Sequence, residues 1–262
     1  HSQGVSLEAL GVPRRDGTTA PAAPREIWRR LAERFHLFLG TPSGYWPEHQ
    51  LHTLFAVQVR PTGATADLIY DPIAERLASP EFRPRALFDR WKIEVLATTD
   101  AAADSLEHHR AIRASGWPGR VIPTFRPDTV FRIAAPEWRG AIAALEQAGG
   151  ATITTWESLL AALRERRAFF RRHGATATDH GLTAPYTQCG AVDEVEAILQ
   201  RALRGTATTD DQRRFEGQLL FEMARMSVED GLVMQVHAGA WRNHDSDTHR
   251  RFGLDCGGDI PV

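Results

Sequence analysis

The chain has 262 residues, of which 42% are hydrophobic and 24% charged, values typical of a soluble globular protein. The formal net charge of -2 gives no argument for nucleic acid or an anionic membrane as a partner, and no stretch approaches the ~18 apolar residues that cross a bilayer. The two cysteines, Cys189 and Cys256, lack C-x-x-C spacing, which favours a reducing compartment, so we expect a cytoplasmic protein.

The first 90 residues are predicted to be mainly helical. Residues 24–40 carry apolar side chains at helical spacing and predict one helix that ends at Gly40. Thr41 and Pro42 are typical of the start of the next helix. Two further amphipathic helices are predicted at residues 67–79 and 83–91. We expect residues 1–90 to form a helical region distinct from the remainder, 91–262.

After residue 90, short apolar runs alternate with amphipathic segments. The runs predict strands at residues 92–100, 120–128, 175–181 and 232–239. The segments between them predict helices at residues 103–116, 137–150, 155–174, 193–205 and 208–231. This alternation is typical of parallel βα units, so the fold class predicted for this region is α/β.

Polar side chains gather at the carboxyl ends of all four predicted strands; Asp100 ends the first, where a capping role is favoured. Arg126 and Asp128 end the second, Asp179 and His180 the third, and His237 the fourth. Ligands bind at this end of the strands in (β/α)8 barrels and in open parallel sheets. These five residues are therefore the first candidates for a functional site.

Four sequence blocks resemble the uronate isomerase (glucuronate isomerase) family of the amidohydrolase superfamily. They are "VLATTDAAADSLEHH", "PTFRPD", "TDHG" and "VMQVHAGAWRNHD", in the order and spacing of that family. The segments "HSQGVSLEALGV" and "FHLFLGTPS" resemble its helical insertion. The resemblance implies a (β/α)8 TIM-type barrel, with the insertion between strands 1 and 2 in residues 1–90 and about strands 2 to 5 in residues 91–262. Both chain ends are then expected to be internal, without strand 1 and strands 6 to 8.

The resemblance implies an aldose–ketose isomerase. Family members convert D-glucuronate to D-fructuronate and D-galacturonate to D-tagaturonate, through a cis-enediolate. It also implies a small uronic acid as substrate, a homo-oligomer, and one divalent metal, zinc being the expected ion, without an organic cofactor. The metal ligands expected from the family are an H-x-H pair on strand 1 and an Asp on strand 8. No H-x-H occurs in the 262 residues, so the main ligands are expected outside this chain.

The family resemblance implies roles for the two central candidates. His237 is expected to contact the metal or the substrate, and the alternative is a buried histidine bonded to a neighbouring carbonyl. Arg126 is expected to bind the uronate carboxylate or an adjacent hydroxyl, because a planar guanidinium binds carboxylates with two hydrogen bonds. Asp128 either orients Arg126 in the substrate site or caps the next segment. A purely structural Arg126–Asp128 pair is the alternative.

Four further residues complete the expected site. Arg242 and Asn243 follow His237 in the same loop, where they either bind sugar hydroxyls or hold the loop. Asp179 and His180 are expected to position His237 or a metal-bound water. The equally open alternative for this pair is an Asp that caps a helix and a histidine on the surface.

Two other functions stay open at this stage. One is another mononuclear, metal-dependent hydrolase of the same superfamily; the third predicted strand, "ATATDHG", offers no lysine to bridge two metals, which disfavours a binuclear centre. The other is an inactive fragment that only binds sugar acids.

Overall fold

The structure is a computed structural model that describes residues 4–18, 22–182, 184–187, 190–254, 256 and 258–261. The chain divides into two compact units. One comprises His1–Lys92 with Trp241–Pro261, and the other Ile93–Ala240. Residues 241–261 thus group with the amino-terminal unit, and the assignment of 1–90 and 91–262 to particular parts of a barrel stays a prediction.

The amino-terminal unit is helical, as predicted. Its elements are α1 (Leu7–Leu10), α2 (Pro24–Glu33), the 3-10 helix η1 (Phe35–Phe38), α3 (Pro42–Phe55), α4 (Ala66–Ala78), the 3-10 helix η2 (Pro80–Phe82), α5 (Pro84–Arg90) and α12 (Ser246–Phe252). A short pair of strands, β7 (Ala240–Trp241) and β8 (Ile260–Pro261), lies before and after α12 in the chain.

The single helix predicted over residues 24–40 is wrong. Helix α2 ends at Glu33, and a 3-10 turn follows in which the rings of Phe35 and Phe38 stack with centroids 5.8 Å apart. The three-residue repeat of a 3-10 helix aligns side chains at i and i+3, so this stacked pair favours the tighter turn. The predicted start of the next helix at Thr41 is confirmed, because the Thr41 hydroxyl accepts a hydrogen bond from the amide of Gly44.

The second unit is built from βα units, as predicted. Its elements are β1 (Leu96–Ala97), β2 (Asp100–Ala101), α6 (Glu107–Ala114), β3 (Val121–Ile122), β4 (Phe125–Arg126), α7 (Asp128–Phe131), α8 (Trp138–Gly149), α9 (Trp156–Arg172), β5 (Ala177–His180), α10 (Val192–Leu203), α11 (Thr209–Asp230) and β6 (Val233–Val236). Each of the first two predicted strands is split into two short ones, β1 with β2 and β3 with β4.

All strand pairs of this unit are parallel. β1 pairs with β3, and a four-stranded sheet has the order β2-β4-β5-β6, so its strands follow one another in the chain. In the register of this sheet, Phe125 faces Thr178, and Asp179 faces Gln235. A parallel order without crossings, with helices between consecutive strands of the sheet, is the arrangement of consecutive strands in a (β/α) barrel.

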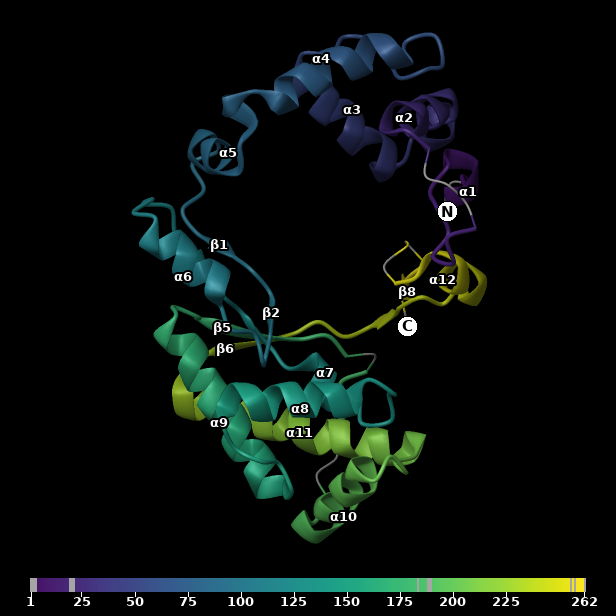
Figure 1. Cartoon of the computed structure of the whole chain (residues 1–262). Coiled ribbons are helices and arrows are strands. Elements are labelled where there is room, and N and C mark those ends of the chain that lie inside the picture. Colours follow the sequence, from purple (N-terminus) through teal and green to yellow (C-terminus); the bar gives the residue numbers. More distant parts are fainter. Residues whose placement is uncertain are drawn as a thin grey trace. The chain divides into compact units, whose positions relative to one another are not determined.

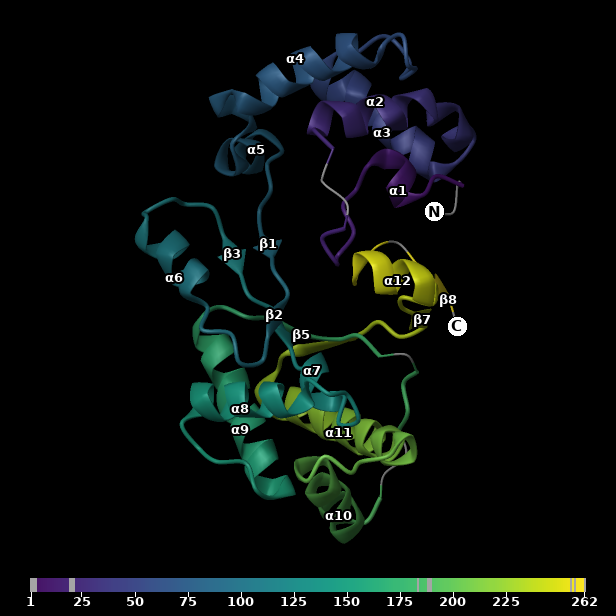
Figure 2. The ribbon, with the colours of Figure 1, turned by 45° about the vertical axis from the view of Figure 1, so that its right-hand side comes forward.

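Helices α7 to α11 gather on one face of the sheet (Figure 1). The same grouping of these helices is seen after a rotation of 45° (Figure 2). The contacts agree, because Phe125 of β4 packs edge-to-face on Phe170 of α9 with ring centroids 5.2 Å apart. Side chains alternate along a strand, so the neighbour of Phe125, Arg126, lies on the opposite face. The helices therefore bury Phe125 and leave Arg126 on the opposite face of β4.

A buried ion pair joins two of these helices. The guanidinium of Arg167 on α9 is 1% exposed and donates to both carboxylate oxygens of Asp230 on α11, at 2.7 and 3.0 Å, and to the hydroxyl of Ser227 at 2.9 Å. Two parallel hydrogen bonds fix both position and orientation of a guanidinium. The pair therefore sets how α9 and α11 meet behind the sheet.

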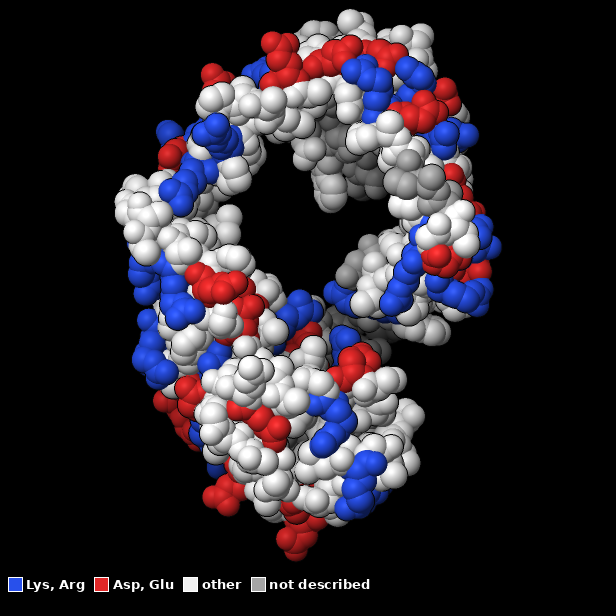
Figure 3. Space-filling model, in the orientation of Figure 1, with Lys and Arg blue, Asp and Glu red and all other residues white. Residues whose placement is uncertain are grey.

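The outer surface carries acidic and basic side chains next to one another (Figure 3). Several form ion pairs along helices, such as Arg214 with Asp210 at 2.9 Å. Within the described ranges, no helix has both the length and the apolar character that a membrane span requires.

Candidate active site

Three polar side chains meet at the carboxyl ends of β4, β5 and β6. Arg126 is the last residue of β4, Asp179 is the penultimate residue of β5, and His237 directly follows β6. The amide of His237 donates to the carbonyl of His180 at 3.1 Å, which extends the β5–β6 pairing by one step. The register places Asp179 opposite Gln235, and His237, two residues further on, shares that face.

Asp179 and His237 form a short hydrogen bond. The Nδ1 atom of His237 lies 2.6 Å from Oδ1 of Asp179, whose side chain is 13% exposed. An ionised carboxylate only accepts, so Nδ1 carries the hydrogen. In the neutral ring the other nitrogen, Nε2, then presents a lone pair. The carboxylate thus fixes both the orientation of the ring and the acceptor that it shows to a ligand.

Arg126 lies against both members of this pair. Its Nη1 is 3.6 Å from Asp179 Oδ2, and its Nη2 is 3.4 Å from His237 Nε2. Its Nε donates to Asp128 Oδ2 at 2.7 Å. The guanidinium remains 31% exposed. Held from two sides by carboxylates, it keeps part of its edge available to an oxygen of a ligand.

Asp128 contacts Arg126 and also links two strand ends. The Asp128 carboxylate is 9% exposed; while Oδ2 accepts from Arg126, Oδ1 accepts from the amide of Gly181 at 3.1 Å. The contact agrees both with an Asp128 that orients Arg126 in a substrate site and with a purely structural pair, so the role of Asp128 stays a prediction. Direct binding of substrate by Asp128 stays a prediction.

His180 occupies the other face of β5. It is fully buried, its ring packs edge-to-face on Phe131 of α7 with centroids 5.9 Å apart, and its Nε2 is 3.1 Å from the Thr178 hydroxyl. Its Nδ1 has no partner among the described atoms. Burial, with a smaller effect of the nearby Arg167 charge, lowers the pKa of His180 to about 4, so the ring is neutral near pH 7.

These contacts exclude one of the two interpretations of the Asp179–His180 pair, and the functional one stays a prediction. The alternative of a capping Asp beside a surface histidine is wrong, because His180 is buried and Asp179 bonds the ring of His237. Asp179 contacts His237 directly through its side chain. His180 contacts His237 only through its backbone carbonyl, because its side chain points to the opposite face.

Arg242 and Asn243 belong to the other compact unit. Both contact Asp259: Nη1 of Arg242 lies 3.0 Å from one carboxylate oxygen, and the amide of Asn243 donates to the other at 2.9 Å. These contacts match the interpretation that the pair holds the shape of its loop. Binding of sugar hydroxyls by either residue stays a prediction.

The residues around His237 do not fit a divalent metal by themselves. One ring nitrogen is bonded to Asp179, and the other faces the positive charge of Arg126 at 3.4 Å. A cation next to a guanidinium is electrostatically unfavourable. Across the part of the chain that the structure describes, no three His, Cys, Asp or Glu side chains are grouped so that they could hold a metal ion.

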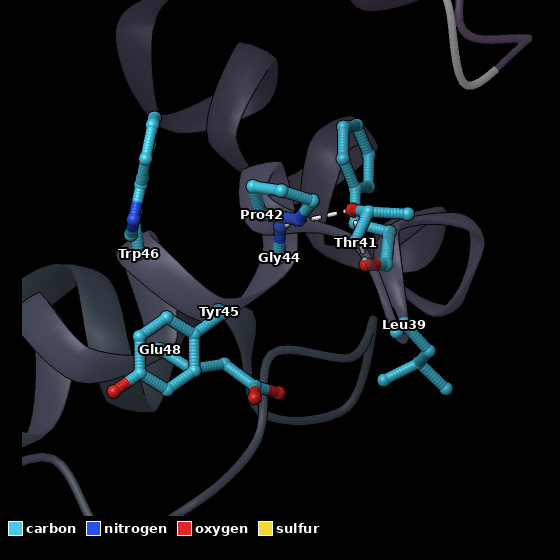
Figure 4. A pocket seen from close by; sticks show the side chains of 9 residues that line it. Leu39, Thr41, Pro42, Gly44, Tyr45, Trp46 and Glu48 are labelled. Atoms are coloured by element: carbon cyan, nitrogen blue, oxygen red, sulfur yellow. Dashed lines mark hydrogen bonds between the residues drawn. The ribbon is translucent and has the colours of Figure 1, made fainter.

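A cavity of about 520 Å³ lies in the helical unit, beside the start of α3 (Figure 4). Thr41, Tyr45, Trp46 and Glu48 are among its lining residues. Its lining is mostly apolar and aromatic, and among the described residues that line it the single charged group is the carboxylate of Glu48. The described residues that line it offer no cationic donor for a sugar oxygen, whereas the Arg126–Asp179–His237 cluster offers the guanidinium of Arg126, so that cluster is the better candidate.

Sequence reasoning missed two residues of this region, Thr178 and Gly181. Thr178 is the hydroxyl partner of His180, and Gly181 lies where the side chains of Arg126, Asp128 and His237 come together. Both stand within or next to the "TDHG" block. A glycine directly after a strand that ends in polar residues is the signal that could have indicated close packing.

A family model described as glucuronate isomerase matches residues 5–261. Among curated proteins, a uronate isomerase of Nostoc punctiforme is 49% identical over 262 residues, which is 100% of this chain and 55% of the relative. A uronate isomerase of Xanthomonas axonopodis pv. citri is 45% identical over 262 residues, which is 100% of this chain and 56% of the relative. The chain thus spans a little over half the length of these relatives.

A solved structure shares the fold. The crystal structure of glucuronate isomerase from Caulobacter crescentus superposes with a TM-score of 0.93 at 42% identity, covering 100% of this chain and 54% of that one. The predicted fold class, part of an α/β barrel with a helical insertion, is confirmed by this likeness together with the parallel strand order.

Proposed function

This chain belongs to the glucuronate isomerase family, and we propose that the complete protein interconverts uronic acids as aldose and ketose. The proposed substrates are D-glucuronate, which would give D-fructuronate, and D-galacturonate, which would give D-tagaturonate. The names of the relatives support the reaction class. The choice between the two sugars is part of the proposal.

The reaction moves hydrogen between two neighbouring carbons. A base removes the proton from C2 of the open-chain aldehyde, and the electrons of that C–H bond form the double bond of a cis-enediolate. The O2 hydroxyl loses its proton as C2 becomes a carbonyl, while C1 and O1 each gain one. Negative charge develops on the oxygens, so a fixed cation beside them lowers the barrier.

The Arg126–Asp179–His237 cluster carries the proposal for this chain. Arg126 would bind a substrate oxygen and stabilise charge that develops on it, because its guanidinium is held by Asp128 and partly exposed. His237 would accept or hold a proton at Nε2, because Asp179 fixes the hydrogen on Nδ1. Asp179 is the positioning residue of this pair. The base that removes the C2 proton is expected outside this chain.

A divalent metal, zinc being the expected ion, remains part of the proposal for the complete protein. When bound, such an ion would polarise a carbonyl or hydroxyl oxygen of the sugar. The described residues alone do not form the site of this ion. We therefore propose that His237 contacts the substrate, and no step of the proposed reaction uses it as a metal ligand. A homo-oligomeric, cytoplasmic protein without an organic cofactor is likewise proposed.

Proton NMR in deuterated water tests the reaction with the full-length protein. D-Glucuronate and D-galacturonate are each incubated with protein whose folding is checked by circular dichroism. Ketose signals, with deuterium at C1 when the C2 proton exchanges with solvent, support the isomerase. A folded protein that forms no ketose from either sugar would refute it, and hydrolysis of an ester or amide substrate would then favour the hydrolase alternative.

A further inference from the structure

A pocket lined by cationic side chains lies in the unit Ile93–Ala240, away from the candidate active site. It has a volume of about 210 Å³, and its lining includes His109, Arg113, Trp117, Arg120 and Gly174. Trp117 and Arg120 lie in the loop that leads into β3, and Gly174 lies between α9 and β5. The pocket is therefore formed at the amino ends of these parallel strands, whereas the candidate active site lies at the carboxyl ends of β4 to β6.

The charged groups in this lining are all cationic. Among the described residues that line the pocket, Arg113 and Arg120 are the charged ones, and none is acidic. With histidine counted as neutral, two arginines and no carboxylate give the lining a formal charge of +2. The carboxylate of Asp100 lies 3.8 Å from Nε2 of His109, but Asp100 does not line the pocket. A lining with this charge favours an anionic ligand.

Both arginines keep hydrogen-bond donors for a ligand. Nη2 of Arg113 donates to the carbonyl of His173 at 2.9 Å, directly after α9. This bond pairs a carbonyl at the negative end of the helix, which would otherwise repel an anion. A guanidinium has five N–H groups, so Arg113 retains others. In the part of the chain that the structure describes, no ion pair or hydrogen bond engages the guanidinium of Arg120.

Two aromatic side chains of the lining are held in place. His109 is 9% exposed, and its Nε2 lies 2.8 Å from the hydroxyl of Thr98, which in turn lies 2.6 Å from Asp100 Oδ2. A carboxylate only accepts, so the hydroxyl donates to Asp100 and the ring of His109 donates to the hydroxyl. The ring of Trp117 packs against Gly119, where an added Cβ would lie 2.1 Å from it. The pocket thus has walls fixed by hydrogen bonding and by packing.

We infer that this pocket binds a phosphate group, either as the free ion or as the end of a small phosphate monoester. A phosphate monoester carries a charge of about -1.5 to -2 near pH 7, which balances two arginines, while a carboxylate balances only one. Its oxygens accept charge-assisted hydrogen bonds from guanidinium groups. The volume of about 210 Å³ lies below the ~300 Å³ at which pockets for larger organic ligands begin, so a nucleotide is too large.

Isothermal titration calorimetry of the full-length protein, without any sugar present, tests this inference. The titrants are inorganic phosphate, glycerol 3-phosphate and acetate at one ionic strength and pH 7.5. Arg120→Met removes a guanidinium that no described group engages, so its effect on folding is small, and Arg113→Met is the second site variant. Arg139→Met is the matched control, because Arg139 is exposed on α8 of the same unit and does not line the pocket. Arg126→Met reports on binding at the candidate active site.

The inference predicts that each of the two site variants raises the Kd for phosphate at least about fivefold, somewhat less than a fully buried charge-assisted hydrogen bond would give. Arg139→Met and Arg126→Met should stay within twofold of unaltered protein, and acetate should bind at least tenfold more weakly than phosphate. Equal sensitivity of glycerol 3-phosphate to the site variants assigns the pocket to a monoester, and binding of inorganic phosphate alone assigns it to the free ion.

Three results would overturn the inference. The first is unaltered protein that binds neither phosphate compound, and the second is acetate that binds as tightly as phosphate. The third is a Kd for phosphate that Arg120→Met and Arg113→Met leave unchanged, including the case in which only Arg126→Met weakens binding and so places the anion in the candidate active site. Because no sugar is present, the outcome is separate from ketose formation, which tests the proposed function.

Discussion

The buried histidine His180 makes the stability of the second unit depend on pH. Its pKa falls from 6.5 in an unfolded chain to about 4 in the folded protein, chiefly because burial disfavours the charged ring. Between these values the unfolded chain binds a proton that the folded protein does not. Stability is therefore fully present above pH 6.5 and is lost as the pH falls toward 4.

The size of the effect follows from the two pKa values. The full difference corresponds to about 3 kcal/mol, of which about 2 kcal/mol is already lost on going from pH 7 to pH 5. Replacing the ring by a group that does not titrate, as in His180→Asn, should remove this part of the pH dependence. The amide of asparagine can still pair with the Thr178 hydroxyl, so the variant keeps one polar contact of the site.

Urea titrations at pH 7 and pH 5, followed by hydrogen-exchange mass spectrometry on peptides that cover β5, measure the free energy of opening in this unit. From pH 7 to pH 5, the free energy of unfolding should fall by about 2 kcal/mol more in unaltered protein than in His180→Asn. His108→Asn is the matched control, because its side chain is 90% exposed and should leave the pH dependence as it is. An identical pH dependence in unaltered protein and His180→Asn would refute the reasoning.

Two further predictions concern the site and the helix layer. Asp179→Asn should lower kcat for D-glucuronate by about 10²-fold with a small change in KM, because His237 loses the carboxylate that fixes its tautomer; steady-state kinetics check this, and an unchanged kcat contradicts it. Arg167→Met should destabilise the second unit by about 3 kcal/mol, because Asp230 loses its buried partner. Arg164→Met, which breaks the exposed Arg164–Glu229 pair, should lower the free energy of unfolding by less than about 1 kcal/mol in the same urea titration. Equal losses in the two variants would contradict the assignment of Arg167–Asp230 as the buried, stabilising pair.

Hydrophobic patterning was enough to predict the βα alternation and the parallel sheet. The run "LVMQVH" is mostly apolar, as strands of a parallel sheet are, and it forms β6 with His237 directly after it. Most of β6 is nevertheless exposed in this structure, so the burial that such a run predicts is not found here. The helix over residues 24–40 failed because periodicity cannot distinguish a continuous helix from one that tightens at Phe35 into a 3-10 turn.

Chain order predicted which residues meet at the strand ends, and the side-chain contacts required the structure. The position of Asp128 two residues after Arg126 suggested their hydrogen bond. The contact between Asp179 and His237 spans 58 residues and depends on the register of β5 and β6, which the sequence does not specify. The burial of His180 depends on Phe131 of α7, and the need for Gly181 depends on three side chains from other elements.

The most direct test of the account is the kcat/KM of the full-length protein on D-glucuronate after Arg126→Met. The account places Arg126 against a substrate oxygen, so the loss should be at least about 10²-fold, as for removal of a charged donor from an active site. Arg225→Met, an equal change on the exposed face of α11, should stay within about twofold of unaltered protein, as expected for a surface substitution. A folded Arg126→Met protein that retains half of the original kcat/KM would contradict the account.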